Sequence, residues 1–376
     1  IVEACIRENR FGFEEVCYLI LFSRLPTQTE LADFTTLMGE LRPLPYGFTE
    51  DMIMKAPSNN IMNKLARCAL ASYSYDSNPD DISYENVLRQ CIRLIAQMPT
   101  MTAYAYQARN HYYYDKSLYI HNPQKGLSTS ENLLQMIRPD SRYTKLEAEI
   151  LDLALVLHAE HGGGNNSSFT VHVVTSTGTD TYSAIAAAIG ALKGPKHVGA
   201  NLKVMDMMED IKAHVGDKRD KGRIKDYLIR LLNKEAYDGS GLIYGIGHAV
   251  YTKSDPRAKL LKRKAEELAA ALGGEWEEEL NFYKTVEELA PSAFEEYKNS
   301  PKVMCANVDF YSGLVYTMLN IPKELFTPIF AISRIAGWSA HRLEELAVSN
   351  RIIRPAYKNV GQKQPYVDLS DRREGL

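Results

Sequence analysis

The sequence predicts an all-α protein with two unequal parts. Apolar residues recur at helical spacing in segment after segment, and only residues 169–177 are rich enough in β-branched side chains to suggest a strand. One such run cannot form a sheet, so a helix-rich setting can override its propensity. The charge-rich portion from about residue 203 to 300 differs from the alanine-rich block before it. This shift indicates a smaller, more solvated domain.

Six segments have the apolar periodicity of helices, and they are residues 1–7, 13–22, 29–41, 84–98, 144–158 and 181–192. The third follows a break at Pro26 and a capped start. The last is small and apolar on nearly all sides, which predicts a helix buried in the interior.

A further helix is expected after Asp255, whose side chain can accept hydrogen bonds from the first free backbone N–H groups. Pro256 suits the first helical position, and Gly273 ends the run of strong helix formers that follows. Arg257 therefore lies in the first turn, nine residues after His248 in a glycine-flanked loop. This spacing suggests a site at which a proton donor, His248, and a fixed cation, Arg257, contact the same small anion. The alternative is a capped surface helix with an incidental histidine.

Length and composition narrow the class of protein. A chain of 376 residues exceeds what one hydrophobic core usually spans, and shares of 45% hydrophobic and 24% charged residues are ordinary for a soluble globular protein. The formal net charge of −3 argues against nucleic acid as the main partner. An anionic ligand would therefore have to be held by a local cluster of arginines.

The cysteines indicate a reducing compartment. They are odd in number, widely spaced and without a Cys-x-x-Cys pair, as expected for reduced, mostly buried thiols: Cys5, Cys17, Cys68, Cys91 and Cys305. No apolar run approaches the roughly 18 residues that cross a bilayer, and no signal peptide is recognisable. Because the chain begins at Ile1, directly in a helical pattern, we expect an N-terminal portion to be missing. We expect a cytoplasmic protein, with the mitochondrial matrix as the alternative.

Four residues in special surroundings are candidates for proton chemistry. His161, His197 and His248 each lie in a glycine-lined loop, where a side chain can reach a ligand while its backbone stays fixed. Each one alone is more often a hydrogen-bonded structural residue. Asp309 stands beside an apolar pair, which raises the pKa of a carboxyl group and suits a general base. The equal alternative is that Asp309 caps a helix.

Two arginines lie among apolar residues. Arg334 falls within Phe-Ala-Ile-Ser-Arg-Ile-Ala-Gly-Trp, and Arg354 falls within Arg-Ile-Ile-Arg-Pro. Burying a guanidinium group is costly unless an anion meets it, and carboxylates are its preferred bidentate partners. We therefore predict that these arginines bind a carboxylate ligand.

These segments together resemble citrate synthases, over essentially the whole chain from residue 13 onward. The strongest matches are residues 158–169, 187–201, 244–257, 307–313 and 325–334. The resemblance implies an all-α fold with a large domain, residues 1–197 and 312–376, and a small domain, residues 198–311, that closes over the active site. It also implies a homodimer.

By the same resemblance, the chain would be an acyltransferase that converts the acyl group to alkyl on transfer. His197 would hydrogen-bond the thioester oxygen of acetyl-CoA while Asp309 removes a methyl proton, and His248 would polarise the keto group of oxaloacetate. Hydrolysis of citryl-CoA would release citrate and CoA. No cofactor and no metal are implied, because acetyl-CoA is a substrate.

Binding roles follow from the resemblance as well. Oxaloacetate would be held by His161, Arg257 and Arg334, with Arg354 reaching in from the partner subunit. The adenine of CoA would be wrapped by a loop of five residues: Leu242, Ile243, Tyr244, Gly245 and Ile246. Thr252 followed by Lys253 departs from the family pattern, in which a basic residue often meets a CoA phosphate at position 252.

Three alternatives stay open. A 2-methylcitrate synthase uses the same catalytic set with propionyl-CoA, and one methylene changes discrimination by only ~1–3 kcal/mol. A metallohydrolase could use His158 and His161 as metal ligands, although their spacing matches neither His-Glu-x-x-His nor His-x-x-Glu-His. A noncatalytic helical scaffold is the third. The glycine runs lack the remaining features of nucleotide-binding motifs.

Overall fold

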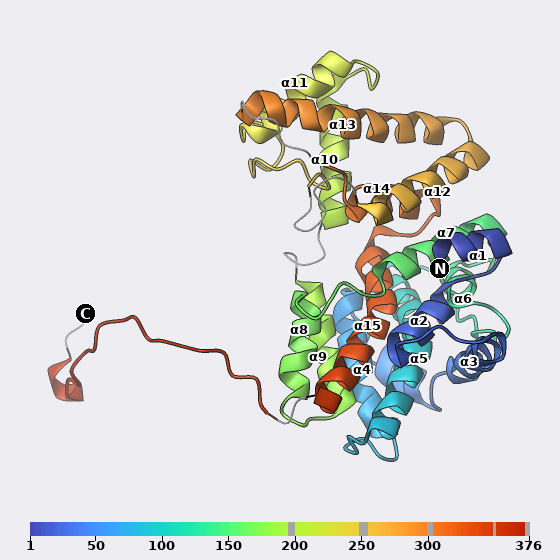
Figure 1. Ribbon diagram of the computed structural model, residues 1–376, viewed down its shortest axis with the longest axis vertical. Coiled ribbons are helices and arrows are strands. Elements are labelled where there is room, and N and C mark those ends of the chain that lie inside the picture. The colour runs from blue at the N-terminus through green and yellow to red at the C-terminus, as the bar shows by residue number, and fades with distance from the viewer. Residues whose placement is uncertain (195–199, 248–254, 299–303, 349–350, 373–376) are drawn as a thin grey trace.

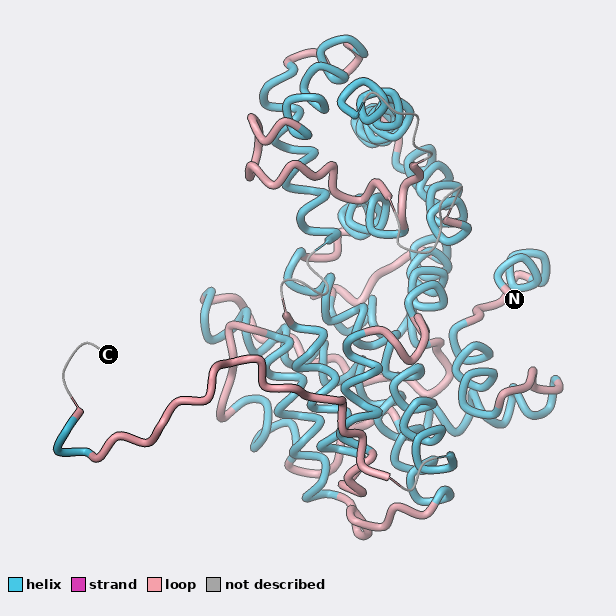
Figure 2. Tube along the Cα trace, turned by 60° about the vertical axis from the view of Figure 1, so that its left-hand side comes forward, coloured by secondary structure: helices cyan, strands magenta, loops and turns pink. Residues whose placement is uncertain are grey.

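The computed structural model describes residues 1–194, 200–247, 255–298, 304–348 and 351–372, and all of its regular elements in these ranges are helices. The β pairing found among them is a single bridge between Ile246 and Ala306. Figure 2 shows helices joined by loops along the described trace. The all-α class predicted from the sequence is confirmed.

The described α-helices are α1 (Val2–Glu8), α2 (Phe13–Phe22), α3 (Gln28–Leu41), α4 (Ile61–Ala71), α5 (Tyr84–Tyr114), α6 (Thr129–Ile137), α7 (Lys145–His158), α8 (Asn166–Thr175), α9 (Thr181–Lys193), α10 (Ala200–Val215), α11 (Lys221–Leu232), α12 (Pro256–Leu272), α13 (Glu275–Lys298), α14 (Val308–Met318) and α15 (Phe326–Val348). Short π or 3₁₀ turns are η1 (Thr49–Met54), η2 (Ser72–Tyr75), η3 (Lys323–Leu325) and η4 (Leu369–Asp371).

Local sequence signals set several helix starts. Three helices begin with a capping box, in which the first side chain and the glutamate three residues later satisfy each other's backbone N–H groups. These pairs are Thr27 with Glu30 at α3, Ser128 with Glu131 at α6, and Thr144 with Glu147 at α7. The capped start expected after Pro26 is confirmed.

Helix α5 continues beyond the predicted end at residue 98, through Pro99, to Tyr114. Proline removes one backbone hydrogen bond and normally bends or ends a helix. Residues 94–108 are nevertheless buried on almost every side, and α5 packs against α3, α4, α6 and α15. Tertiary packing therefore outweighs the local cost.

The strand-like run at residues 169–177 lies mostly in helix α8, which packs against α9 and α15. Helical packing has overridden β propensity here, as the isolation of this run suggested. Helix α9 was expected to be buried all round, and this prediction is wrong at Gly190. Ala184, Ile185 and Ala188 are fully buried, whereas Gly190 is exposed because α4, α8 and α15 leave that side uncovered.

The helices pack in two groups, which Figures 1 and 2 show one above the other. Helices α10 to α14 pack on one another, and α15 packs with the earlier helices α2, α4, α5, α7, α8 and α9. Contacts between α12 and α7 join the groups. The predicted domain boundary after residue 197 lies outside the described residues, and the one after residue 311 falls inside α14. Both boundaries stay a prediction.

The C-terminal segment, residues 351–372, leaves the helical body as an extended strip that Figure 1 shows in red. It starts near the end of α8, where the backbone N–H of Ile353 donates to Oγ of Ser176 at 3.0 Å. Tyr357 and Val360 are each 90% exposed along it. Large apolar side chains that are exposed along an extended segment are typical of a segment that packs against another protein surface.

The cysteines follow the sequence prediction, since no disulfide joins them and four of the five are buried. Within the described ranges, no helix combines the length and the apolar character that crossing a membrane requires.

Helix α3 approaches the main chain so closely at Gly39 that we predict a clash for Gly39→Ala. A Cβ there would overlap the carbonyl oxygen of Lys125 and lie 3.1 Å from its carbonyl carbon. Because backbone atoms cannot move aside cheaply, we expect a loss of about 1–3 kcal/mol in the free energy of unfolding. Urea unfolding measures this loss. Gly126→Ala is the control, since nothing lies within 4 Å of that Cβ; equal stability of the two variants would contradict the prediction.

Candidate active site

Arg334 is a buried cation whose hydrogen-bonding capacity is largely unused. It lies in α15 with no exposed surface, and its Nε donates to the main-chain oxygen of His158 at 2.7 Å. Its guanidinium carbon lies 4.6 Å from the ring centroid of Phe330. Neither Nη1 nor Nη2 has a hydrogen-bond partner among the described residues. Burial lowers the pKa of Arg334 to about 10. Two aligned donors in such a place suit a carboxylate ligand.

Asp309, at the start of α14, shares this environment. Burial raises the pKa of its carboxyl group to about 6, while the charges of Arg257 and Arg334 partly oppose the shift and that of Asp255 adds to it. The charges that act on Asp309 thus come from the start of α12 and from α15. A carboxylate that titrates close to neutrality is suited to accept a proton.

The histidine that ends α7 belongs to the same cluster. His158 is 2% exposed, and burial together with the charges of Arg334, Arg257 and His161 lowers its pKa to about 3. Its imidazole is therefore neutral at physiological pH. Nδ1 of His158 has no hydrogen-bond partner among the described residues.

The start of α12 has the cap that the sequence predicts. Oδ1 of Asp255 accepts the backbone N–H of Arg257 at 3.0 Å, and Pro256 occupies the first helical position. The Asp255 carboxylate also accepts from Nε at 3.1 Å and from Nη2 at 2.9 Å of the same arginine. The Arg257 side chain is only 17% exposed. Arg257 is therefore mostly shielded from solvent, although α12 also has a solvent-exposed face that includes Lys259 and Arg263.

The cap of α14 is Asn307, whose Oδ1 accepts the backbone N–H of Asp309 at 3.0 Å. The alternative in which Asp309 is itself the cap is therefore wrong. Because Asn307 caps α14, the Asp309 carboxylate does not serve as the helix cap.

The loop predicted to hold CoA lies against the start of α14. The backbone N–H of Asn307 donates to the oxygen of Gly245 at 2.8 Å, and that of Gly247 donates to the oxygen of Cys305 at 2.7 Å. Gly245 has a φ of +79°, and a Cβ there would lie 2.8 Å from side-chain atoms of Phe310 and Val204. Glycine is required at this close approach. Within the loop, Leu242 is 54% exposed and Ile243 is buried.

His161 lies just beyond α7 in an exposed loop. Oε1 of Glu160 accepts its backbone N–H at 2.7 Å and also accepts the backbone N–H of Gly162. The same oxygen accepts from Nε2 of His341 in α15 at 3.0 Å. The loop of His161 is thus attached to α15 through one carboxylate.

His197, His248, Thr252 and Lys253 lie outside the described residues. Arg354 is exposed on the C-terminal segment.

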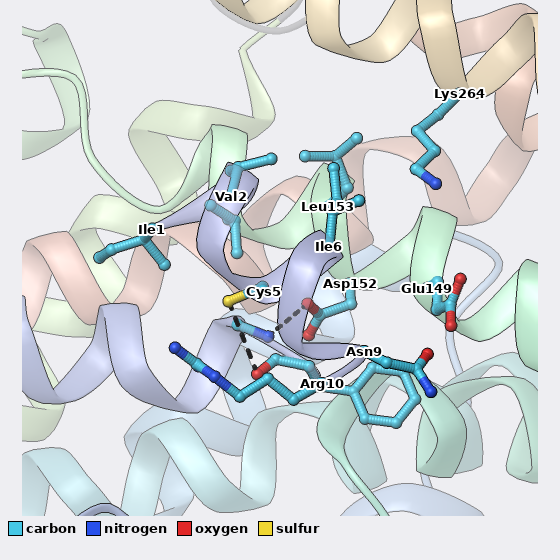
Figure 3. A pocket seen from close by; sticks show the side chains of 13 residues that line it. Ile1, Val2, Cys5, Ile6, Asn9, Arg10, Glu149, Asp152, Leu153 and Lys264 are labelled. Atoms are coloured by element: carbon cyan, nitrogen blue, oxygen red, sulfur yellow. Dashed lines mark hydrogen bonds between the residues drawn. The ribbon is translucent and has the colours of Figure 1, made fainter.

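A separate pocket, drawn in Figure 3, lies between α1 and α7. None of the predicted site residues that the structure describes lines it. Asp152 in its wall accepts the backbone N–H groups of Gly12 at 2.7 Å and Phe13 at 3.2 Å, which start α2. Burial raises the pKa of Asp152 to about 8. This carboxyl group has a structural task, so we place no chemistry here.

Sequence reasoning did not single out Phe330 or Glu160. Phe330 precedes Arg334 by four residues, the spacing at which helical side chains meet, and this spacing was available as a signal. Glu160 interacts with His341, which is distant in sequence, and no local pattern predicts that pair.

Comparison with known proteins identifies the relatives of this architecture. A family model described as "Citrate synthase, C-terminal domain" matches residues 1–356. The chain belongs to the citrate synthase family. It is 36% identical to a citrate synthase of Synechocystis over 96% of this chain and 84% of that one. It is 35% identical to the citrate synthase of Haloferax volcanii, over 94% and 86% of the two chains.

Solved citrate synthases share the fold. The enzyme of Pyrobaculum aerophilum superposes with a TM-score of 0.81 at 32% identity, covering 99% of this chain and 88% of that chain. The enzyme of Thermoplasma acidophilum superposes with a TM-score of 0.80 at 25% identity, covering 99% and 91%. That structure is a ternary complex with carboxymethyl-coenzyme A and oxaloacetate. Enzymes of the citrate synthase family condense acetyl-CoA with oxaloacetate.

Two buried arginines of α15 offer a matched test of this site. Arg342 is as buried as Arg334, but its guanidinium nitrogens donate to oxygens of three residues: Thr181 at 3.0 Å, Thr175 at 3.2 Å and Thr179 at 2.8 Å. We expect Arg334→Met to leave the melting temperature nearly unchanged and to abolish the rise in it that we predict oxaloacetate to cause.

Arg342→Met should do the reverse. It should lower the free energy of unfolding by about 3 kcal/mol, because it leaves buried oxygens without donors, and it should keep the response to oxaloacetate. Thermal unfolding with and without oxaloacetate measures both effects. If Arg334→Met retained the full response, Arg334 would not be the anion-binding group.

Proposed function

We propose that this protein is a citrate synthase that condenses acetyl-CoA with oxaloacetate through an enol or enolate and then hydrolyses citryl-CoA. The observation that carries the proposal is the combination at one place of Arg334, with two unused donors, and Asp309, with a pKa of about 6. The first suits a carboxylate substrate, and the second suits proton abstraction at neutral pH.

Oxaloacetate carries two carboxylates, and the proposed site presents several cations to them. Arg257 and Arg334 come from the start of α12 and the middle of α15. His161 contributes from the loop after α7, where Glu160 fixes its backbone. Arg354 is proposed to complete the set from the partner subunit. Because these cations lie close to the substrate carboxylates, the protein as a whole needs no positive net charge to bind oxaloacetate.

The proton transfers can be assigned to three groups. Asp309 takes a proton from the methyl carbon of acetyl-CoA, while His197 hydrogen-bonds the thioester oxygen on which negative charge develops. The new nucleophile attacks the keto carbon of oxaloacetate, and His248 protonates the resulting alkoxide. Water then cleaves the thioester to give citrate and CoA.

The two-part architecture supports a closing mechanism. We propose that residues 198–311 form the small domain and that residues 1–197 and 312–376 form the large one. Closure would exclude water while the enol forms and admit it for hydrolysis. The CoA loop, residues 242–246, lies against the start of α14, the helix that carries Asp309. No cofactor is needed for these steps.

Surface features support a homodimer. Phe169 of α8 is 48% exposed, Gly190 of α9 is uncovered, and the extended C-terminal segment presents Tyr357 and Val360. Such apolar surface is typical of an interface between subunits. The five cysteines, which no disulfide joins, and the bacterial and archaeal relatives support a cytoplasmic location.

The pKa of Asp309 predicts both activity and stability. Its carboxylate is the base, so kcat/KM should fall about tenfold per pH unit below pH 6. Asp309→Asn should lower kcat by about 10²–10⁴-fold. Because the pKa is raised in the folded state, ionised Asp309 costs stability above pH 6. The variant should therefore melt at a higher temperature than the wild type at pH 8.

Thiol release from acetyl-CoA plus oxaloacetate and thermal unfolding measure these effects. Unchanged turnover by folded Asp309→Asn protein would exclude Asp309 as the base.

Substrate choice is tested by kcat/KM for acetyl-CoA and propionyl-CoA. We expect acetyl-CoA to be preferred; a clear preference for propionyl-CoA would instead assign the chain to the 2-methylcitrate synthases, one of which, from Shewanella oneidensis, is 32% identical to it over 93% of this chain.

The role of Arg354 across subunits can be tested by mixing two inactive variants. When Arg354→Ala and Asp309→Asn chains are refolded together, each mixed dimer should contain one complete site, which restores about a quarter of wild-type activity in a random mixture. If Arg354 served its own subunit, no mixed dimer would contain a complete site and activity would stay absent.

A further inference from the structure

A cluster of two histidines and three glutamates joins α8, α15 and the loop of His161, and nothing in the proposed reaction uses its histidines. The cluster consists of His172 in α8, Glu160 after α7, and three residues of α15: His341, Glu344 and Glu345. Its centre is the pair His172 and His341, whose Nε2 and Nδ1 atoms face each other at 3.2 Å.

Hydrogen bonds at the far side of each ring fix which nitrogen bears hydrogen. Nδ1 of His172 lies 2.8 Å from Oε2 of Glu345, and Nε2 of His341 lies 3.0 Å from Oε1 of Glu160. A carboxylate can only accept, so these two nitrogens donate. In neutral rings, the nitrogens that face each other then both present lone pairs.

A third lone pair points to the same place. Oε2 of Glu344 lies 3.0 Å from Nδ1 of His341 and 3.9 Å from Nε2 of His172. With both rings neutral, three electron-pair donors converge without a hydrogen between them and repel one another. A cation at their centre, either a proton or a metal ion, removes the repulsion.

The geometry points to a divalent transition-metal site, of the Zn²⁺ class, formed by His172, His341 and Glu344; this is the inference that we propose. The three separations of 3.2, 3.0 and 3.9 Å define a point about 2.0 Å from every donor atom, which is the bonding distance of Zn²⁺ to imidazole nitrogen and carboxylate oxygen. Imidazole ligands favour such ions over Mg²⁺ or Ca²⁺.

The surroundings have the features of a metal site. Histidine ligands characteristically donate their other N–H to a carboxylate, as both rings do here, and this fixes the ring orientation and raises its basicity. Glu160, His341 and Glu344 line an open surface pocket, through which an ion and a completing water could enter. A Cβ at Gly163 would lie 3.1 Å from Nε2 of His172, so the glycine loop packs closely against the rings.

The site would act on the loop that carries His161. A metal ion on Nδ1 would fix the His341 ring, whose Nε2 donates to the Glu160 oxygen that also accepts the backbone N–H of His161. Occupancy should therefore stiffen this loop. The resulting decrease in KM for oxaloacetate rests on the proposed function; the metal binding itself does not.

Metal binding is tested on the full chain after treatment with a chelator. Equilibrium dialysis should give one Zn²⁺ per chain, and Co²⁺ in its place should give the visible absorption of a four-coordinate ion. Mg²⁺ in excess should not displace Zn²⁺.

Two ligand variants and a matched control locate the site. Glu344 is 60% exposed, so Glu344→Gln should fold normally, and it should weaken Zn²⁺ binding at least about 10-fold. His172→Gln should do the same. His214→Gln is the control, because His214 also lies beside a carboxylate, Asp210 at 3.6 Å, but outside the cluster. It should bind Zn²⁺ like the wild type.

Absence of Zn²⁺ binding by the wild type, or equal affinity in the wild type and both ligand variants, would overturn the proposal. The cluster would then be a hydrogen-bonded network that shares an extra proton. If Zn²⁺ binds as described but acetyl-CoA and oxaloacetate give no thiol release, the metal site stands and the proposed citrate synthase function fails.

Discussion

The buried guanidinium of Arg334 is the constraint on which the arrangement of this protein depends. It lies in α15, which contacts α2, α4, α5, α7, α8 and α9, so a positive charge is buried within the larger group of helices. The main-chain oxygen of His158 and the ring of Phe330 hold the group in place while leaving two nitrogens unused. Such a charge costs stability until an anion meets it. The same helix that organises the core therefore also creates the need for a ligand.

The remaining site groups are brought to this charge by helix ends. Asn307 caps α14 and leaves the Asp309 carboxylate free, and Asp255 caps α12 while orienting the Arg257 side chain. At a capped helix start the backbone position is fixed, and the direction in which each side chain leaves the backbone is therefore fixed as well. The site is thus assembled from short, well-determined elements of both helix groups, and movement of one group relative to the other would change the separation of these charges.

Periodicity and capping predicted much of the secondary structure, because both act within a few residues. The cap at Asp255 and the limits of α2 at residues 13 and 22 are examples. Predictions were incomplete where packing outweighed local preference. Helix α5 runs on through Pro99 inside a buried environment, and the β-branched run that begins at Phe169 is helical because its neighbours α9 and α15 are helices.

The sequence by itself determined the residue types, the helix starts and the family resemblance, including the expectation that Asp309 and Arg334 act together. Only the tertiary structure decided their chemical state. The pKa of Asp309 rises because burial removes water from its carboxylate, and Nη1 and Nη2 of Arg334 are buried without a hydrogen-bond partner in the part of the chain that the structure describes. Likewise, His172 and His341 are 169 positions apart, and only the packing of α8 on α15 brings their ring nitrogens together. Desolvation and contact between distant residues are properties of the packed chain, and no local pattern encodes them.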